Sequence, residues 1–289
     1  MGLEGNRLWP PYAIAIASMG HERLGSPGQW RVNVRLLALG AVIAGVLALL
    51  VFAERFNRPV PRAAAPVARA PKPVSDHLVR RHVDLGRSVL GRPIDAVELG
   101  DPDNERRTLV VGAIHGNEQA GIPIAKALAA HHPPEEALVW IVENLNPDGV
   151  AAGTRQNADR VDLNRNFPWR WRPLGAPGDP QYSGPRPLSE PEAKIAHSLI
   201  LRQRPRITIW FHQPLGLVDE SGGSIAIERR FSRLTGLPLH RLFRYPGSAA
   251  GWQDHRLPHT TAFVAELPPG SVPPRDVSLY AHAVLRLAS

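Results

Sequence analysis

The chain has 289 residues, a net charge of +8 at neutral pH and no cysteine. This length allows one or two domains, and the lack of cysteine excludes disulfides and cysteine metal ligands. Residues 1–74 hold 9 Lys and Arg against 3 Asp and Glu, whereas residues 75–289 hold 25 against 23. The charge is therefore +6 in the first part and +2 in the second, which argues against a nucleic-acid-binding domain. The charge of +6 on residues 1–74 favours contact of this part with anionic lipid or polymer.

An apolar run without a charged side chain covers residues 36–53. At ~1.5 Å per residue, a helix of this length just spans a bilayer, so we expect a transmembrane anchor after a disordered tail at residues 1–35. Removal of a signal segment after Ala53 is the alternative, and a buried core helix is a third. Residues 54–75 are rich in Pro and Ala, which predicts a semi-rigid extended linker. A folded domain is expected over residues 76–289.

In this domain, apolar runs of strand length alternate with segments of helix length. The expected strands are 96–99, 108–114, 138–142, 207–211 and 262–267, and the expected helices are 121–131, 190–202, 223–235 and 275–287. Ser189 and Glu192 have the spacing of a capping box, which would mark the start of the second helix. The alternation predicts an α/β fold with a mixed, mostly parallel central sheet and helices on both faces.

A histidine and a glutamate follow the run 108–114 (TLVVGAI), at positions 115 and 118. Residues three apart in a turn point the same way, so His115 and Glu118 offer two metal ligands from one turn. A catalytic zinc takes imidazole nitrogen and carboxylate oxygen, with three protein ligands and one open position. Because this spacing also arises by chance, the prediction depends on a third ligand.

His212 follows the run 207–211 (ITIWF), and Glu266 lies near the end of the run 261–267 (TAFVAEL). Side chains at the carboxyl ends of strands meet at one edge of an open α/β sheet. His212 therefore completes a predicted His₂Glu zinc site. A buried carboxylate costs free energy unless it has a partner or a role, so Glu266 is the predicted general base. An exposed residue on an edge strand is the alternative for Glu266.

The segment 146–168 is rich in Gly, Asn, Asp and Pro, which is typical of a loop. Asn164 and Arg165 suit a substrate with a free carboxylate, because Arg keeps its charge and binds carboxylates through two parallel hydrogen bonds. Arg155 is a candidate to polarise the scissile carbonyl and stabilise the oxyanion. Surface salt bridges are the alternative for each of these arginines.

Together these segments resemble the zinc carboxypeptidase family. The resemblance covers the chain from about residue 80 onward, and its motifs follow the family's order: residues 85–94 (LGRSVLGRPI), His115 with Glu118, residues 162–167 (DLNRNF), residues 189–192 (SEPE), His212 and Glu266. Three segments are most similar to the members of the family that cleave cell-wall (murein) peptides: residues 153–158 (GTRQNA), 183–192 (SGPRPLSEPE) and 212–216 (HQPLG).

The resemblance implies a carboxypeptidase-like fold and one Zn²⁺ per chain. It implies that the metal is held by His115, Glu118 and His212. It also implies roles for the remaining site residues, namely a general base (Glu266), a carbonyl-polarising arginine (Arg155) and anchors for the terminal carboxylate (Asn164 and Arg165). These roles agree with the ones that the residue types suggest.

Two features depart from the family's pattern. The family often closes a tyrosine over the substrate, and Tyr245 precedes Glu266 at about that distance, but the Gly-Ser after it comes early and we do not assign it a role. Residues 247–252 (GSAAGW) are expected to line the specificity pocket. This segment has no acid that would select Lys or Arg, and its small residues leave room for a larger polar group with two ends, such as diaminopimelate.

The sequence therefore predicts a zinc-dependent peptidase or amidase that cleaves before a C-terminal residue with a free carboxylate. The favoured bond is γ-D-glutamyl-diaminopimelate in murein peptides. The alternatives are a general metallocarboxypeptidase, an N-acyl amino acid deacylase and an inactive wall-binding domain. The expected location is the bacterial inner membrane, with the enzyme domain in the periplasm, or the periplasm or exterior after signal cleavage. A peptide substrate and the membrane are the expected partners, and nucleic acid is not.

Overall fold

The computed structural model describes residues 78–289. The expected tail, membrane segment and linker at 1–35, 36–53 and 54–75 lie outside this range, as do the first two residues of the expected domain. Within residues 78–289, no helix combines the length and the apolar character that crossing a bilayer requires.

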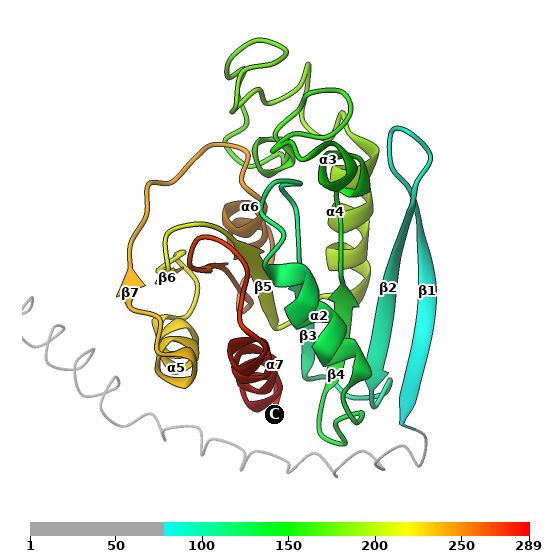
Figure 1. The fold of residues 1–289 in the computed structure, drawn as a ribbon, viewed down its shortest axis with the longest axis vertical. Coiled ribbons are helices and arrows are strands. Elements are labelled where there is room, and N and C mark those ends of the chain that lie inside the picture. Colours follow the sequence, from blue (N-terminus) through cyan, green and yellow to red (C-terminus); the bar gives the residue numbers. More distant parts are fainter. Residues whose placement is uncertain (1–77) are drawn as a thin grey trace, which may run out of the picture. The chain divides into compact units, whose positions relative to one another are not determined.

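An eight-stranded mixed sheet forms the centre of the domain, in the order β1-β2-β4-β3-β5-β8-β6-β7 (Figure 1). The strands β4, β3, β5 and β8 run parallel to one another, β1 and β2 form an antiparallel hairpin at one edge, and β6 runs antiparallel to β8. The bounds are β1 Val79–Arg87, β2 Pro93–Gly100, β3 Arg107–Val111, β4 Leu138–Val142, β5 Ile207–His212, β6 Leu217–Asp219, β7 Leu239–His240 and β8 Thr261–Glu266. The predicted α/β class with a mixed sheet is confirmed.

Helices cover both faces of this sheet, as predicted. One apolar core joins the sheet to α2 (Gly121–Ala130), α5 (Ile225–Thr235) and α7 (Pro274–Ala288), and Figure 1 shows α7 between the other two. A second core joins the opposite face to α4 (Pro191–Gln203) and α6 (Ala249–Arg256). A short helix α3 (Pro147–Ala152) and a 3₁₀ turn η1 (Leu163–Arg165) lie in the loop-rich segment before α4.

The central strands are buried on both faces, which is why they appear in the sequence as continuous apolar runs. In β3, Val110 packs into the first core, whereas Leu109 and Val111 pack into the second. β4 alternates in the same way, because successive side chains of a strand point to opposite faces. The segments that were predicted as strands were therefore the ones that reach both cores.

Most of the elements that were not predicted lie at edges or in the loop region, whereas helix α6 packs against the second core and was also missed. β1 contains three Arg, a His and an Asp and is held by its pairing with β2, so its sequence has no apolar run to mark it. β6 and β7 are too short to show a period. The strand expected to reach residue 114 ends at Val111. It is followed by Gly112, where a Cβ would lie 2.4 Å from the Glu143 carbonyl oxygen.

The predicted capping box at Ser189 is wrong. The N-cap of α4 is Glu190, and Pro191 occupies the first turn, where its fixed φ suits a helix start. The Ser189 hydroxyl instead donates to the Glu190 carboxylate at 2.6 Å. Glu192 turns away from the cap and accepts from the Val89 N–H at 3.0 Å. Ser189 and Glu192 have the spacing of a capping box, but their side chains form hydrogen bonds with other groups, Glu190 and Val89.

Candidate metal centre

Three parallel neighbouring strands carry the predicted site at their carboxyl ends. His115 lies in the turn that follows β3, His212 is the last residue of β5, and Glu266 is the last residue of β8. His212 and Glu266 are direct partners in the register of β5 and β8. The sheet order β3-β5-β8 thus brings together groups that lie up to about 150 positions apart in the sequence, at the edge where open α/β sheets bind ligands.

His115, Glu118 and His212 are buried, and each offers a ligand atom within 4.8 Å of the others. The two imidazoles approach the same carboxylate: His115 Nδ1 lies 3.0 Å from Glu118 Oε1, and His212 Nδ1 lies 2.8 Å from Glu118 Oε2. With zinc–ligand bonds of about 2.0–2.1 Å at tetrahedral angles, neighbouring ligand atoms stand roughly 3.3 Å apart. The spacing in the structure therefore fits a zinc ion bound to all three residues.

Asp162 fixes the orientation of one of these ligands and was not assigned a role from the sequence. It is fully buried, and its Oδ1 lies 2.9 Å from His115 Nε2. A proton on Nε2 donates to Asp162 and leaves Nδ1 as the lone-pair nitrogen that a metal requires. Asp162 begins the DLNRNF motif, so an acid ahead of the Asn-Arg pair was the available signal.

The charges around the ligands keep the two carboxylates ionised. Burial raises the pKa of Glu118, but His212 and His115 lower it by more than burial raises it. The net result is a pKa well below the ordinary value. Burial likewise raises the pKa of Asp162, while His115 and Arg155 bring it far below the usual range. Burial lowers the pKa of His115, but Asp162 and Glu118 outweigh that effect and raise it. Both acids can thus act as anionic ligand and anionic support.

Arg155 lies between these two acids. Its Nη1 donates to Glu118 Oε1 at 2.8 Å, and its Nε donates to Asp162 Oδ2 at 3.0 Å. The side chain is 26% exposed and lines the cavity in front of the metal ligands. The surface salt bridge that we considered for this arginine does not occur, because both of its partners are buried site residues. Its action on a scissile carbonyl stays a prediction.

Asn164 and Arg165 line the same cavity. The Asn164 side-chain oxygen accepts from the Ala249 N–H at 2.9 Å, which ties the residue to the start of α6. Arg165 Nη1 donates to the Asn164 carbonyl at 2.8 Å, and Nε is buried with no hydrogen-bond partner within residues 78–289. Burial lowers the pKa of Arg165. A desolvated guanidinium with a free donor is suited to a substrate carboxylate, although that role stays a prediction.

Tyr245, to which no role was assigned from the sequence, also lines this cavity. Its ring lies under the Arg165 guanidinium, with 4.0 Å between the Arg165 Cζ and the ring centroid. Phe243 packs edge-on against the same ring at 4.9 Å and is 72% exposed. Two aromatic residues thus flank the predicted carboxylate anchor.

Glu266 faces the cavity from the end of β8 and is buried. Burial raises its pKa, His212 lowers it and Glu118 raises it, with a net upward shift. Its Oε2 accepts only a long hydrogen bond, at 3.5 Å, from the Leu215 N–H. The alternative of an exposed edge-strand residue is wrong, because β8 is an interior strand with β5 on one side and β6 on the other.

The cavity that contains these groups has a volume of about 540 Å³. Ser248, Ala250 and Gly251 form part of its wall, as expected from the small residues of segment 247–252. The wall also contains Asp219 at the end of β6, paired with Arg244 at 2.7 Å. The segment 247–252 has no acid, as stated from the sequence, but Asp219 adds one to the cavity from another element.

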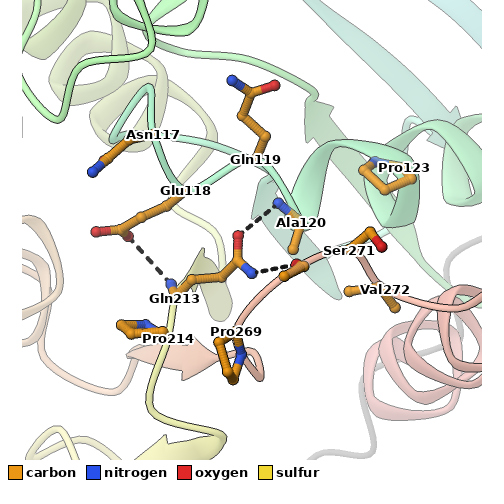
Figure 2. Close-up of a pocket in the computed structure, with 11 residues that line it drawn as sticks. Asn117, Glu118, Gln119, Ala120, Pro123, Gln213, Pro214, Pro269, Ser271 and Val272 are labelled. Atoms are coloured by element: carbon orange, nitrogen blue, oxygen red, sulfur yellow. Dashed lines mark hydrogen bonds between the residues drawn. The ribbon is translucent and has the colours of Figure 1, made fainter.

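Glu118 also lines a second cavity, of about 540 Å³ (Figure 2). The two cavities share Glu118, Gln213 and Pro214, so they meet at one of the predicted metal ligands, Glu118. Pro123, Pro214 and Pro269 give the second cavity an apolar lining.

Gln213 joins the walls of this second cavity (Figure 2). Its side-chain oxygen accepts from the Ala120 N–H at 3.1 Å, and its Nε2 donates to the Pro268 and Gly270 carbonyls, each at 2.8 Å. Its backbone N–H points at Glu118 Oε2 at 3.3 Å. Gln213 thus ties the turn that carries Glu118 to the loop that follows Glu266, a role that the HQPLG segment alone did not show.

Comparison with known proteins places this site in a family. The family model described as zinc carboxypeptidase matches residues 76–214. Murein peptide amidase A from Vibrio campbellii is 32% identical over 211 residues, which cover 68% of this chain and 82% of that protein. The sequence resemblance drawn from the motifs is confirmed.

Solved structures give the same result. The crystal structure of a murein-tripeptide amidase from Escherichia coli O157 matches with a TM-score of 0.60 and 27% identity, over 75% of this chain and 95% of that one. Carboxypeptidase A from Helicoverpa armigera matches with a TM-score of 0.61 at 16% identity, over 73% of this chain and 68% of that one. The second match supports the fold alone.

Proposed function

The chain belongs to the zinc carboxypeptidase family of zinc-dependent hydrolases, and we propose that it removes a C-terminal residue with a free carboxylate from murein peptides. The favoured scissile bond joins γ-D-glutamate to diaminopimelate. Relatives named as murein peptide amidases support this choice. The observation that carries the proposal is the meeting of two cavities at Glu118, one of the predicted metal ligands.

The two cavities suggest how a peptide binds. The leaving residue occupies the cavity lined by Asn164 and Arg165, where its carboxylate meets the desolvated guanidinium. The acyl part of the peptide occupies the proline-lined cavity beside Gln213. The scissile bond then lies at Glu118 and Pro214, which both cavities share.

We assign a residue to each step of the hydrolysis. Zinc, when bound by His115, Glu118 and His212, supplies a Lewis acid that polarises the carbonyl and makes water more acidic. Glu266 accepts a proton from the attacking water and delivers it to the leaving amine, which its raised pKa favours. Arg155 donates to the oxygen that becomes negative in the transition state.

The supporting residues hold this geometry before the substrate arrives. Asp162 keeps the proton of His115 on Nε2, so that Nδ1 stays directed at the metal. Gln213 holds the Glu118 turn and the loop after Glu266 at a fixed separation. Preorganised donors of this kind need no rearrangement during the reaction, which is the main source of electrostatic catalysis.

Two other activities use the same metal ligands. A general metallocarboxypeptidase would accept ordinary all-L peptides. An N-acyl amino acid deacylase would accept small acyl groups, but the second cavity offers more room than a small acyl group fills. Both are distinguished by the choice of substrate in the experiment below.

The location is a separate proposal that rests on the sequence of residues 1–75. We propose that the protein sits at the bacterial inner membrane with the enzyme domain in the periplasm, where murein lies, or that it is released there after signal cleavage. Fractionation of cells into membrane, periplasm and cytoplasm would test this. Recovery of the full-length chain in the cytoplasm would contradict both forms of the proposal.

The experiment that tests the function is mass spectrometry of the products from L-Ala-γ-D-Glu-meso-diaminopimelate, using the purified, zinc-loaded full chain. Release of free diaminopimelate, lost in Glu266→Gln, would support a murein peptide amidase. If the tripeptide stays intact while all-L peptides lose their C-terminal residue, the general carboxypeptidase is the correct activity. If only acyl amino acids are cleaved, the deacylase is correct.

A further inference from the structure

One wall of the active-site cavity holds an ion pair that the proposed chemistry does not use. Asp219, the last residue of β6, and Arg244 both line the cavity, with 2.7 Å between Arg244 Nη1 and Asp219 Oδ2. The other oxygen of Asp219 accepts from the Leu242 N–H at 2.8 Å, which fixes the acid. The Arg244 side chain is 25% exposed.

Arg244 has donor capacity left over. Its Nη2 is buried and has no hydrogen-bond partner within residues 78–289. A buried donor without a partner costs on the order of 1–3 kcal/mol, and a ligand oxygen at this wall would offset that cost. A carboxylate is the best such ligand, because the planar guanidinium binds it through two parallel hydrogen bonds.

The same wall also has an excess of acids. Ser221 lines the cavity. Its hydroxyl oxygen lies 2.6 Å from Glu228 Oε1 and 3.1 Å from Asp254 Oδ2. The carboxyl groups of Glu228 and Asp254 therefore contact a residue of the same wall that holds the Asp219–Arg244 pair. A hydroxyl has a single proton to donate, so one of the two contacts of Ser221 requires a proton on a carboxyl group.

These charges distinguish the wall from a pocket that selects basic residues. A lone acid at the end of a pocket favours Lys or Arg. Here Asp219 is paired with Arg244, so the wall presents an anion and a cation side by side. The complementary ligand group carries both an ammonium and a carboxylate.

We propose that Arg244 and Asp219 bind the far end of the leaving residue when that end is an α-amino acid group, with the carboxylate on Arg244 and the ammonium on Asp219 and Ser221. This inference rests on the proposed function, because it assigns the second end of the same leaving residue whose first carboxylate binds Asn164 and Arg165. It makes Arg244 a specificity-determining residue.

The test compares three peptides that share L-Ala-γ-D-Glu and differ only in the last residue. The first ends in meso-diaminopimelate, the second in meso-diaminopimelate whose distal carboxylate is an amide, and the third in L-Lys, which lacks that carboxylate. For the wild type we expect kcat/KM to fall roughly 100-fold from the first peptide to either of the others, because a buried polar site rejects ligands that leave it unpaired.

Arg244→Met is the key variant. It should lower kcat/KM for the diaminopimelate peptide by roughly 100-fold and remove the difference between that peptide and its amide. It should also raise activity on the lysine peptide, since Asp219 then stands as a lone acid in the pocket. Arg241→Met is the matched control, because Arg241 lies on the same segment and is exposed.

Folding is checked by zinc content and Tm of each variant. If Arg244→Met loses either, the double variant Arg244→Met with Asp219→Asn replaces it, because it leaves no unpaired charge. In the double variant the diaminopimelate and lysine peptides should be cleaved with similar kcat/KM.

The outcomes separate this inference from the proposed function. Wild-type cleavage of the γ-D-glutamyl peptides without preference for diaminopimelate would overturn the role of Arg244 and leave the amidase activity intact. The same conclusion follows if Arg244→Met keeps the wild-type preference. If the zinc-loaded wild type cleaves all-L peptides and no γ-D-glutamyl peptide, the proposed function and this inference are both wrong.

Discussion

Two pairs of carboxyl groups lie beside one cavity, and their pKa values are shifted in opposite directions. On the metal side, Glu118 and Asp162 have pKa values far below the ordinary range. At Ser221, on the wall that also contains Arg244, burial raises the pKa of Glu228, and it raises the pKa of Asp254 to about 7. Burial acts upward on all four groups, so burial is not what distinguishes them.

The difference comes from their partners. Glu118 and Asp162 contact two imidazoles and Arg155, all within hydrogen-bond distance. Asp254 accepts hydrogen bonds from the Ala262 N–H and the Ser221 hydroxyl, and these, together with the charge of Arg244, do not offset its desolvation. An acid that stays ionised can bind a metal, and an acid that holds a proton near neutral pH can serve as a neutral hydrogen-bonding group. Glu266 lies beside the metal ligands, like Glu118, but its pKa is raised, like those of Glu228 and Asp254.

Removing a metal ligand should have the largest effect. His212→Ala leaves two ligands and is expected to lose stoichiometric zinc after dialysis, along with turnover. Metal analysis by mass spectrometry measures the zinc. His240→Ala, which changes an exposed histidine on β7, is the control and should keep one zinc per chain. Full zinc occupancy in His212→Ala would contradict the predicted ligand set.

Glu266→Gln should separate metal binding from catalysis. The amide cannot accept the proton of the attacking water, so kcat should fall by roughly 10³-fold or more, while the zinc content stays at one per chain. Turnover and metal content are measured on the same sample. Near-normal turnover would remove Glu266 from its role as base.

Asp162→Asn tests whether partners, and not burial, keep the metal side ionised. An amide is a weaker partner for His115 Nε2, so zinc affinity should fall about 10–100-fold, as measured by competition with a chelator. Asp148→Asn is the matched control, because Asp148 is also buried and paired with an arginine, Arg92, at 2.6 Å. Equal losses in both variants would mean that Asp162 acts only through general stability.

Asp254→Asn should have the smallest effect of these variants. It changes a carboxyl group that contacts Ser221 in the cavity wall. Since its folded pKa is about 7 and lies above the ordinary value, the folded chain keeps a proton that the unfolded chain has already released. Stability therefore falls as pH rises from roughly 4 through 7. The amide can keep the contacts to Ala262 and Ser221, so the variant should lose less Tm than the wild type between pH 5 and 8.

The control for this measurement is Asp159→Asn. Asp159 is exposed in a turn, and its replacement should leave the change of Tm with pH as it is in the wild type. If Asp254→Asn and the wild type lose Tm in parallel, the proton near neutral pH belongs to another group, with Glu228 as the next candidate.

Much of the fold could be predicted because the central strands are buried on both faces. Their apolar runs and the four helices predicted between and after them indicated the α/β class and the positions of these elements to within a few residues, but helix α6 was missed. The edge elements β1, β6 and β7 could not be predicted in the same way. They are stabilised by pairing with distant strands, and nothing in their own composition shows it.

For the site, the sequence alone determined what local spacing controls. His115 and Glu118 share one turn, so their side chains converge, and Asn164 and Arg165 are neighbours in one loop. The tertiary structure decided the contacts between distant elements: the pairing of His212 with Glu266, the bond from Asp162 to His115, and the ion pair of Asp219 with Arg244. These contacts depend on strand order and register, which arise only when both cores pack, because no interaction between near neighbours specifies them.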